Sequence, residues 1–178
     1  MSFGPLKVRI YGDPCLRAKS KPVKEVGPVE RMLIAAMFET MRAHKGIGLA
    51  APQVGINEQI FVVDTGKEYF AAINPKIIKS TGVEAMEEGC LSIPKVIVNV
   101  KRSKTVLVEF MDEDSRHVQA TLTGLTAKVF QHEHDHLQGK LILDYLPAAL
   151  RQEIAAQIKD GTYKGKDSDD DHGDKRKI

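Results

Sequence analysis

The stretch QHEHDHLQG, residues 131–139, places three histidines and two carboxylates within five consecutive positions. In a strand, all three histidines would point to one face, because side chains alternate with a period of two. In a helix, only His132 and His136 would be neighbours, one turn apart, and His134 would point away. The two geometries imply different metal chemistry, so the local structure of this stretch has to be decided first.

The apolar residues before the histidines follow helical spacing. Five positions separated by steps of three or four residues form one helical face. They are Leu122, Leu125, Val129, His132 and His136. Gly139 follows where a C-terminal glycine cap is expected. The sequence therefore predicts a helix on which His132 and His136 flank one point in space, with His134 on the other side, solvated or supporting the ligands.

His132, Glu133 and His136 then form an HExxH pattern, in which two imidazoles bind a metal and the glutamate acts as a general base. Glu133 lies about 100° round the helix from His132, close enough to reach a ligand on the metal without binding the metal itself. The same residues on a helix can also be ordinary surface residues. The apolar stripe that leads into both histidines favours the metal site.

A catalytic metal of this kind needs a third protein ligand and one open position. Ile142 stands where a metzincin protease has its third histidine, so that solution is excluded. Glu153, the only downstream glutamate, is disfavoured because it lies on a predicted helix whose apolar face is formed by its neighbours. The candidates upstream are His44, His117 and the two cysteines.

Cys90 is favoured over Cys15 because of its context, EEGCLSIP. Gly89 permits a close approach of the backbone, and we expect Cys90 on a loop that enters a strand at Leu91 and stops at Pro94. A thiol in that position could reach a buried helix face. Cys15 is interpreted as a small buried residue.

Composition places the chain among ordinary globular proteins. It has 178 residues, 42% of them hydrophobic and 28% charged, and a formal charge of +2, which gives no reason to expect nucleic-acid or membrane binding. No apolar run approaches the roughly 20 residues of a membrane span, and the first residues lack the apolar segment of a signal peptide. We expect a cytoplasmic protein with both cysteines reduced.

The rest of the pattern predicts one catalytic domain over residues 1–163. A helix is expected at 29–44, ended by Gly46, and another at 147–159. Strands are expected at 59–64, 71–78, 95–100, 105–112 and 116–122, the last two joined by a hairpin loop. The tail, residues 164–178, has almost no apolar residues and is predicted to be disordered.

Three motifs in order resemble those of the peptide deformylase family. They read GIGLAAPQ (46–53), EGCLS (88–92) and HEHDHLQG (132–139), against GxGLAAxQ, EGCLS and HExDHLxG. The resemblance extends from about residue 8 to residue 146. The segment KVIVNVKR (95–102) departs from the Arg- or Tyr-containing segments common in the family, which concerns substrate preference rather than the reaction.

The resemblance implies an α+β fold, with antiparallel or mixed sheets around a central helix that carries HExxH. It implies Cys90, His132 and His136 as metal ligands, with ferrous iron in the cell and zinc, nickel or cobalt able to replace it. The substrates implied are N-formylmethionyl peptides, as nascent chains near the ribosome. A zinc endopeptidase that shares only HExxH, and a non-enzymatic protein with a closed four-ligand metal site, are the alternatives.

The resemblance also implies roles for further residues. Glu133 would take a proton from the attacking water and deliver it to the leaving amine. The Gln53 side-chain amide and the Leu91 backbone N–H would donate hydrogen bonds to the oxyanion. Glycines would let the peptide backbone lie close, and four apolar residues would lie near a methionine pocket, with plain core packing an equal alternative for each. The glycines are Gly46, Gly48 and Gly89, and the apolar residues are Ile47, Met86, Leu125 and Val129.

Overall fold

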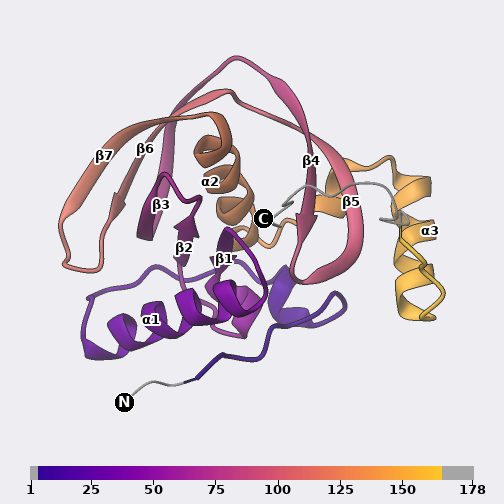
Figure 1. Ribbon diagram of the computed structural model, residues 1–178, viewed down its shortest axis with the longest axis horizontal. Coiled ribbons are helices and arrows are strands. Elements are labelled where there is room, and N and C mark those ends of the chain that lie inside the picture. The colour runs from indigo at the N-terminus through magenta and orange to yellow at the C-terminus, as the bar shows by residue number, and fades with distance from the viewer. Residues whose placement is uncertain (1–3, 166–178) are drawn as a thin grey trace.

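The computed structural model describes residues 4–165 and contains two antiparallel sheets (Figure 1). The larger sheet has the strand order β1-β2-β3-β6-β7, and β4 pairs only with β5. The strands are β1 Gly48–Ala50, β2 Ile60–Asp64, β3 Tyr69–Thr81, β4 Glu84–Cys90, β5 Ile93–Arg102, β6 Thr105–Met111 and β7 His117–Thr123. The expected α+β class with antiparallel sheets is confirmed.

Three α-helices and three short 3-10 helices accompany the sheets within the described residues. The α-helices are α1 Pro28–Ala43, α2 Gly124–Leu137 and α3 Ala148–Lys159, and the 3-10 helices are η1 Pro14–Arg17, η2 Ala51–Val54 and η3 Ile142–Tyr145. The predicted helices at 29–44 and 147–159 correspond to α1 and α3. The residues predicted as a disordered tail lie, from 166 onward, outside the described residues.

The five-stranded sheet is covered by a helix on each face, as the alternation in β2 shows. Phe61 and Val63 belong to the apolar cluster that includes α2, whereas Ile60 and Val62 belong to the cluster formed with α1. Alternate residues of a strand point to opposite faces, so a short, fully buried strand can serve both cores. α2 therefore lies on the inner face of this sheet, with β4 and β5 on its other side (Figure 1).

The β4–β5 pair has its own apolar cluster. Cys90 and alternate residues of β5 pack with Leu141, Ile142 and Leu143 of the η3 region, and Ile154 and Ile158 of α3 pack against them. Ile154 and Ile158 of the α3 helix are thus partly buried, whereas Leu150 on the same helix is 42% exposed. The end of β4 is therefore held beside α2 by an apolar cluster to which α2 contributes no residue.

Several local predictions from the sequence are wrong. Leu122 lies in β7 rather than on α2, which begins at Gly124. Cys90 is the last residue of a strand rather than part of a loop, and β5 continues through Pro94, which an edge strand tolerates. α1 is followed by Lys45, with φ of 57°, before Gly46, so the left-handed residue is the lysine.

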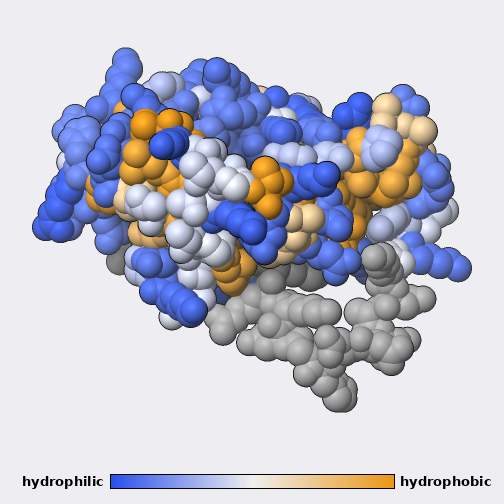
Figure 2. Space-filling view, turned by 90° about the horizontal axis from the view of Figure 1, so that it is seen from above, coloured by the Kyte–Doolittle hydropathy of each residue, from blue (hydrophilic) through white to orange (hydrophobic). Residues whose placement is uncertain are grey.

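None of the helices between residues 4 and 165 is both long and apolar enough to cross a membrane. Figure 2 shows a largely hydrophilic surface in which apolar residues form separate patches.

Candidate metal centre

Three buried donor atoms converge where the end of β4 meets α2. Cys90 Sγ lies 3.3 Å from His136 Nε2, which lies 3.2 Å from His132 Nε2. All three ligand atoms lie within 4.8 Å of one another, and the three residues form the one group of this kind found among the described residues. One turn of α2 separates the two histidines, as the spacing predicted, and the inner face of β4 supplies the thiol.

Glu88 fixes the orientation of the His132 ring. Its Oε2 lies 2.9 Å from His132 Nδ1, and a carboxylate can only accept, so the imidazole carries its proton on Nδ1. This tautomer leaves the Nε2 lone pair directed toward Cys90 and His136. A carboxylate behind a ligating histidine is a common way of setting ring orientation and basicity.

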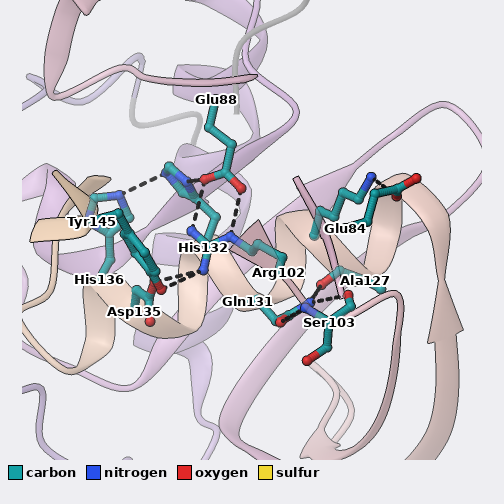
Figure 3. A network of polar contacts seen from close by, with 11 residues as sticks. Glu84, Glu88, Arg102, Ser103, Ala127, Gln131, His132, Asp135, His136 and Tyr145 are labelled. Atoms are coloured by element: carbon teal, nitrogen blue, oxygen red, sulfur yellow. Dashed lines mark hydrogen bonds and ion pairs between the residues drawn. The ribbon is translucent and has the colours of Figure 1, made fainter. Parts of the chain in front are cut away.

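Arg102 neutralises Glu88 through two parallel hydrogen bonds. Arg102 Nε donates to Glu88 Oε1 at 2.7 Å and a terminal nitrogen donates to Oε2 at 2.9 Å. The other terminal nitrogen donates to Asp135 Oδ2 at 2.8 Å, and Tyr145 also donates to Asp135, at 2.7 Å (Figure 3). Burial alone would raise the pKa of Glu88, but the hydrogen bonds from His132 and Arg102 outweigh it and hold the pKa below its usual range.

The donor set fits a metal ion. Burial raises the pKa of the Cys90 thiol to about 12 and lowers the pKa of His136 well below its usual value. A buried neutral imidazole offers a lone pair at once, and a metal ion would replace the thiol proton. One thiolate and two imidazoles are ligands for zinc or iron and leave an open position on the ion.

Glu133 lies beside these donors with its carboxyl group fully buried. Neither carboxyl oxygen has a hydrogen-bond partner among the described residues, and burial raises the pKa of the carboxyl well above its usual range. Gly48 lies against it: a Cβ at this position would run into the Glu133 carboxyl group and would come within 2.9 Å of Val129 Cγ1. A buried acid without a partner, next to three metal donors, is suited to exchanging protons with a bound molecule.

Gln53 and Leu91 both reach the same centre, from η2 and from the turn between β4 and β5. Gln53 Oε1 accepts from the Ala50 backbone N–H at 2.8 Å, which directs its Nε2 toward Cys90 Sγ at 3.6 Å and Ser92 Oγ at 3.3 Å. Leu91 follows the cysteine directly, and its side chain lies near Gly46. The structure thus brings both predicted oxyanion donors next to the thiol.

The residues predicted to bind the peptide lie on β1, β4 and α2 and directly before β1. Gly48 is in β1 with Ile47 before it, and Gly89 is in β4 opposite Ile97 of β5. Met86 packs against the cluster that contains Ile47 and Val129. Leu125 is 43% exposed at the start of α2, so it is a surface residue rather than a core residue.

Other ligand candidates lie elsewhere. His44, His117, Cys15 and Glu153 do not belong to the cluster of donors. Cys15 is partly buried and its thiol donates to the Pro52 carbonyl. His134 is partly buried on α2, where burial lowers its pKa.

Sequence reasoning missed the carboxylate and guanidinium behind His132. Glu88 stands two residues before Cys90, so in a strand it shares the cysteine's face; recognising β4 as a strand would have found it. Arg102 and Tyr145 carry no local signal because they reach Glu88 and Asp135 only through the fold.

Comparison with known proteins gives one family. The family described as "Polypeptide deformylase" matches residues 5–152. A relative from Pseudothermotoga lettingae, named peptide deformylase, is 48% identical over 153 residues, which cover 85% of this chain and 89% of the relative.

Solved structures agree. The crystal structure of peptide deformylase from Thermotoga maritima matches with a TM-score of 0.78 at 43% identity, covering 80% of this chain and 98% of that one. A peptide deformylase from Synechococcus elongatus in complex with actinonin matches with a TM-score of 0.82 at 39% identity, covering 92% of this chain and 90% of that one.

Proposed function

The chain belongs to the polypeptide deformylase family, and from this premise we propose that Cys90, His132 and His136 hold the metal ion on which its activity depends. The enzyme is a peptide deformylase, which hydrolyses the formyl group from formylated peptides. The observation that carries the proposed site is the convergence of three buried donors beside Glu133, a buried carboxyl group with no partner among the described residues.

We propose Fe²⁺ as the ion, with Zn²⁺, Ni²⁺ or Co²⁺ able to occupy the same ligands. The thiolate and the two imidazoles suit each of these ions. When bound, the ion supplies Lewis-acid chemistry: it lowers the pKa of a water molecule and polarises the formyl carbonyl. Metal analysis of protein purified without oxygen should find one iron per chain, and a persistently different metal would overturn the choice of iron.

Glu133 moves the proton in this account. In its ionised form, which a nearby cation favours, the buried carboxyl group accepts a proton from the attacking water and then delivers it to the leaving amine. Gly48 keeps the carboxyl group close to the backbone of β1, because a larger residue would displace it. The absence of a competing hydrogen bond within the described residues leaves both oxygens of Glu133 available for this exchange.

Gln53 and Leu91 stabilise the oxyanion that forms from the formyl carbonyl. The Gln53 side chain is held by the Ala50 N–H, so its amide donor is positioned before the substrate arrives. The Leu91 backbone N–H lies in the turn beside Cys90. Losing one donor of this kind costs about 10²–10³ in rate.

An extended peptide can be bound between the two sheets. β1 is the edge of the five-stranded sheet and β4 has β5 on one side only. An exposed strand edge recognises a peptide through main-chain hydrogen bonds. The strand edges proposed to bind the peptide are the backbones of Gly46–Gly48 and Gly89. The glycines carry no side chain, so a substrate backbone can lie close to them.

The first side chain of the peptide is proposed to be methionine, placed against Ile47, Met86, Leu125 and Val129. Three of these residues share one apolar cluster. Leu125 is exposed, as expected for a residue at the mouth of a pocket. The substrates in the cell are then N-formylmethionyl nascent chains in the cytoplasm, near the ribosome.

The test is hydrolysis of formyl-Met-Ala-Ser by the wild type and by Glu133→Gln, with casein as a second substrate. The wild type should deformylate the peptide and leave casein intact. Glu133→Gln should lose activity by about 10²–10⁴ and keep its metal. Retained turnover in Glu133→Gln would overturn the role of Glu133, and cleavage of casein would favour the endopeptidase alternative.

A further inference from the structure

Besides the contact between Cys90 and His136, β4 and α2 are joined by two side-chain contacts that lie four residues apart on both elements. Glu88 contacts His132, and Glu84 accepts a hydrogen bond from the Lys128 ammonium. Figure 3 shows both contacts along the helix. The first belongs to the metal centre. The second is not used by the chemistry described above, and it sits one helical turn farther from the ligands.

The two elements advance by different distances between these contacts. Four residues advance a strand by about 13 Å but a helix by only about 6 Å. Near the ligands the contact is direct, with Cys90 Sγ 3.3 Å from His136 Nε2. Farther back, the contact is made by the long side chains of Lys128 and Glu84.

Met86 of β4 stands between the two contacts and packs against the apolar cluster that contains Val129. This residue lies midway between Glu84 and Glu88 and shares their face of β4, because strand side chains alternate. On the helix, Leu125 and Val129 lie three residues before and one residue after Lys128. The ion pair therefore borders the residues against which the first side chain of the substrate is proposed to bind.

The ion pair is asymmetric in burial. Lys128 is 8% exposed, whereas the Glu84 side chain is 49% exposed. A buried ammonium group requires a partner, and on β4 Glu84 provides it. The hydrogen bond from Lys128 lowers the pKa of Glu84, so the carboxylate stays charged to a lower pH than an ordinary glutamate does. Lys128 is thus held against β4 by its pairing with a residue of that strand.

We propose that the Glu84–Lys128 ion pair sets the spacing between β4 and α2 beside Met86 and so selects the first side chain of the formylated peptide by size. This inference rests on the proposed function, which places that side chain against Met86, Leu125 and Val129. Lys128 and Glu84 act here as specificity-determining residues; they transfer no proton and bind no metal.

The test compares kcat/KM for formyl-Met-Ala-Ser and formyl-Phe-Ala-Ser in the wild type, Lys128→Met and Lys128→Arg. Methionine matches the length of lysine without its charge, and arginine keeps the ion pair. In Lys128→Met the preference for methionine over phenylalanine should fall about tenfold, a change of the size expected for a small alteration of an apolar pocket, mainly through KM for the phenylalanine peptide. Lys128→Arg should retain most of the preference.

Two further variants separate selectivity from general damage. Glu84→Gln should also reduce the preference for methionine over phenylalanine. Because the Glu84 side chain is half exposed, this substitution buries no new group. Arg17→Met removes another ion pair, to Asp144 at 2.6 Å, and should leave the ratio unchanged. An equal fall in kcat/KM for both peptides in Lys128→Met and Glu84→Gln, with the ratio within twofold of the wild type, would overturn the inference.

The rate at which a chelator removes the metal provides a readout independent of activity. The contact between Glu88 and His132 remains in Lys128→Met and Glu84→Gln, so the rate of metal loss in both should match the wild type. A rate that rises together with the change in preference would show damage to the metal centre and overturn the inference. A wild type that deformylates neither peptide would refute the proposed function, whereas an active wild type with unaltered variant ratios would refute only the role of the ion pair.

Discussion

Toward the five-stranded sheet α2 presents an apolar side, and toward β4 and β5 it presents a polar one. The apolar side consists of Ala127, Phe130 and Leu137, all buried in one cluster. The polar side consists of Lys128, Gln131, His132 and Asp135, each bonded to a residue of β4, β5 or the turn after β5. Apolar packing holds a helix in place without directing any group, whereas hydrogen bonds fix the direction of each ring and charge.

The difference shows which side positions the chemistry. The three residues proposed to bind the metal need a defined orientation, and His132 gains it from Glu88 and Arg102 rather than from packing. We therefore expect changes on the polar side to affect metal retention and selectivity, and changes on the apolar side to affect stability alone.

Arg102→Met should have the largest effect. It leaves the Glu88 carboxylate buried without its cation, and breaking such a pair costs about 3–5 kcal/mol. The variant should also bind metal about 10–100-fold more weakly. Urea unfolding and metal titration measure both quantities. Arg116→Met is the control, because its ion pair with Asp114 is exposed and should contribute less than about 1 kcal/mol. Unchanged metal affinity in folded Arg102→Met would contradict the role given to the polar side.

Gly48→Ala should lower kcat by about 10²-fold, because the added methyl group displaces the Glu133 carboxyl group on which proton transfer depends. Circular dichroism should show a folded protein, since φ at this residue is not in the left-handed region. Gly27→Ala, at the start of α1, should leave kcat unchanged. Wild-type turnover in Gly48→Ala would mean that the carboxyl group need not occupy its observed position.

Phe130→Leu tests the apolar side. Phe130 makes an edge contact with Phe61 at 4.9 Å between ring centroids, and replacing this fully buried ring by the smaller leucine leaves a cavity that costs about 1–3 kcal/mol. Thermal unfolding should detect the loss, while chelator resistance and the methionine preference stay at wild-type values. A change in either of those two properties would remove the distinction between the sides of α2.

The smallest effect is a pH dependence at Glu84. The hydrogen bond from Lys128 lowers its pKa below the ordinary 4.5, so the folded state binds this proton less tightly than the unfolded state. The resulting stabilisation is complete above 4.5 and is lost as the pH falls through the lowered pKa. The difference in free energy of unfolding between the wild type and Glu84→Gln should therefore shrink in acid, whereas the difference for Phe130→Leu should not. A constant difference for Glu84→Gln would show that the pair contributes nothing.

The sequence predicted the helical part of the site because helical spacing is a local property. The steps of three and four that end at His132 and His136 describe α2 correctly from Leu125 onward. The same spacing wrongly included Leu122, since its strand β7 ends at Thr123, directly before the helix. Glycine was a good guide at Gly139, which has φ of 71°, and a poor one at Gly46, where Lys45 makes the turn.

β4 could not be recognised from its pattern. Its inner face reads Glu84, Met86, Glu88 and Cys90, so residues with site functions occupy the positions at which apolar side chains would reveal a strand. β1 has only three residues, too few to show a period. Arg102 reaches Glu88 across the sheet, and no pattern in the chain indicates such a contact.

X-ray absorption at the metal edge of the zinc-loaded enzyme tests the central assignment most directly. The account predicts one sulfur at about 2.3 Å and two imidazole nitrogens at about 2.0–2.1 Å, with the sulfur signal missing in Cys90→Ser and kept in Cys15→Ser. A spectrum without sulfur in the wild type, or one that loses sulfur only in Cys15→Ser, would contradict it.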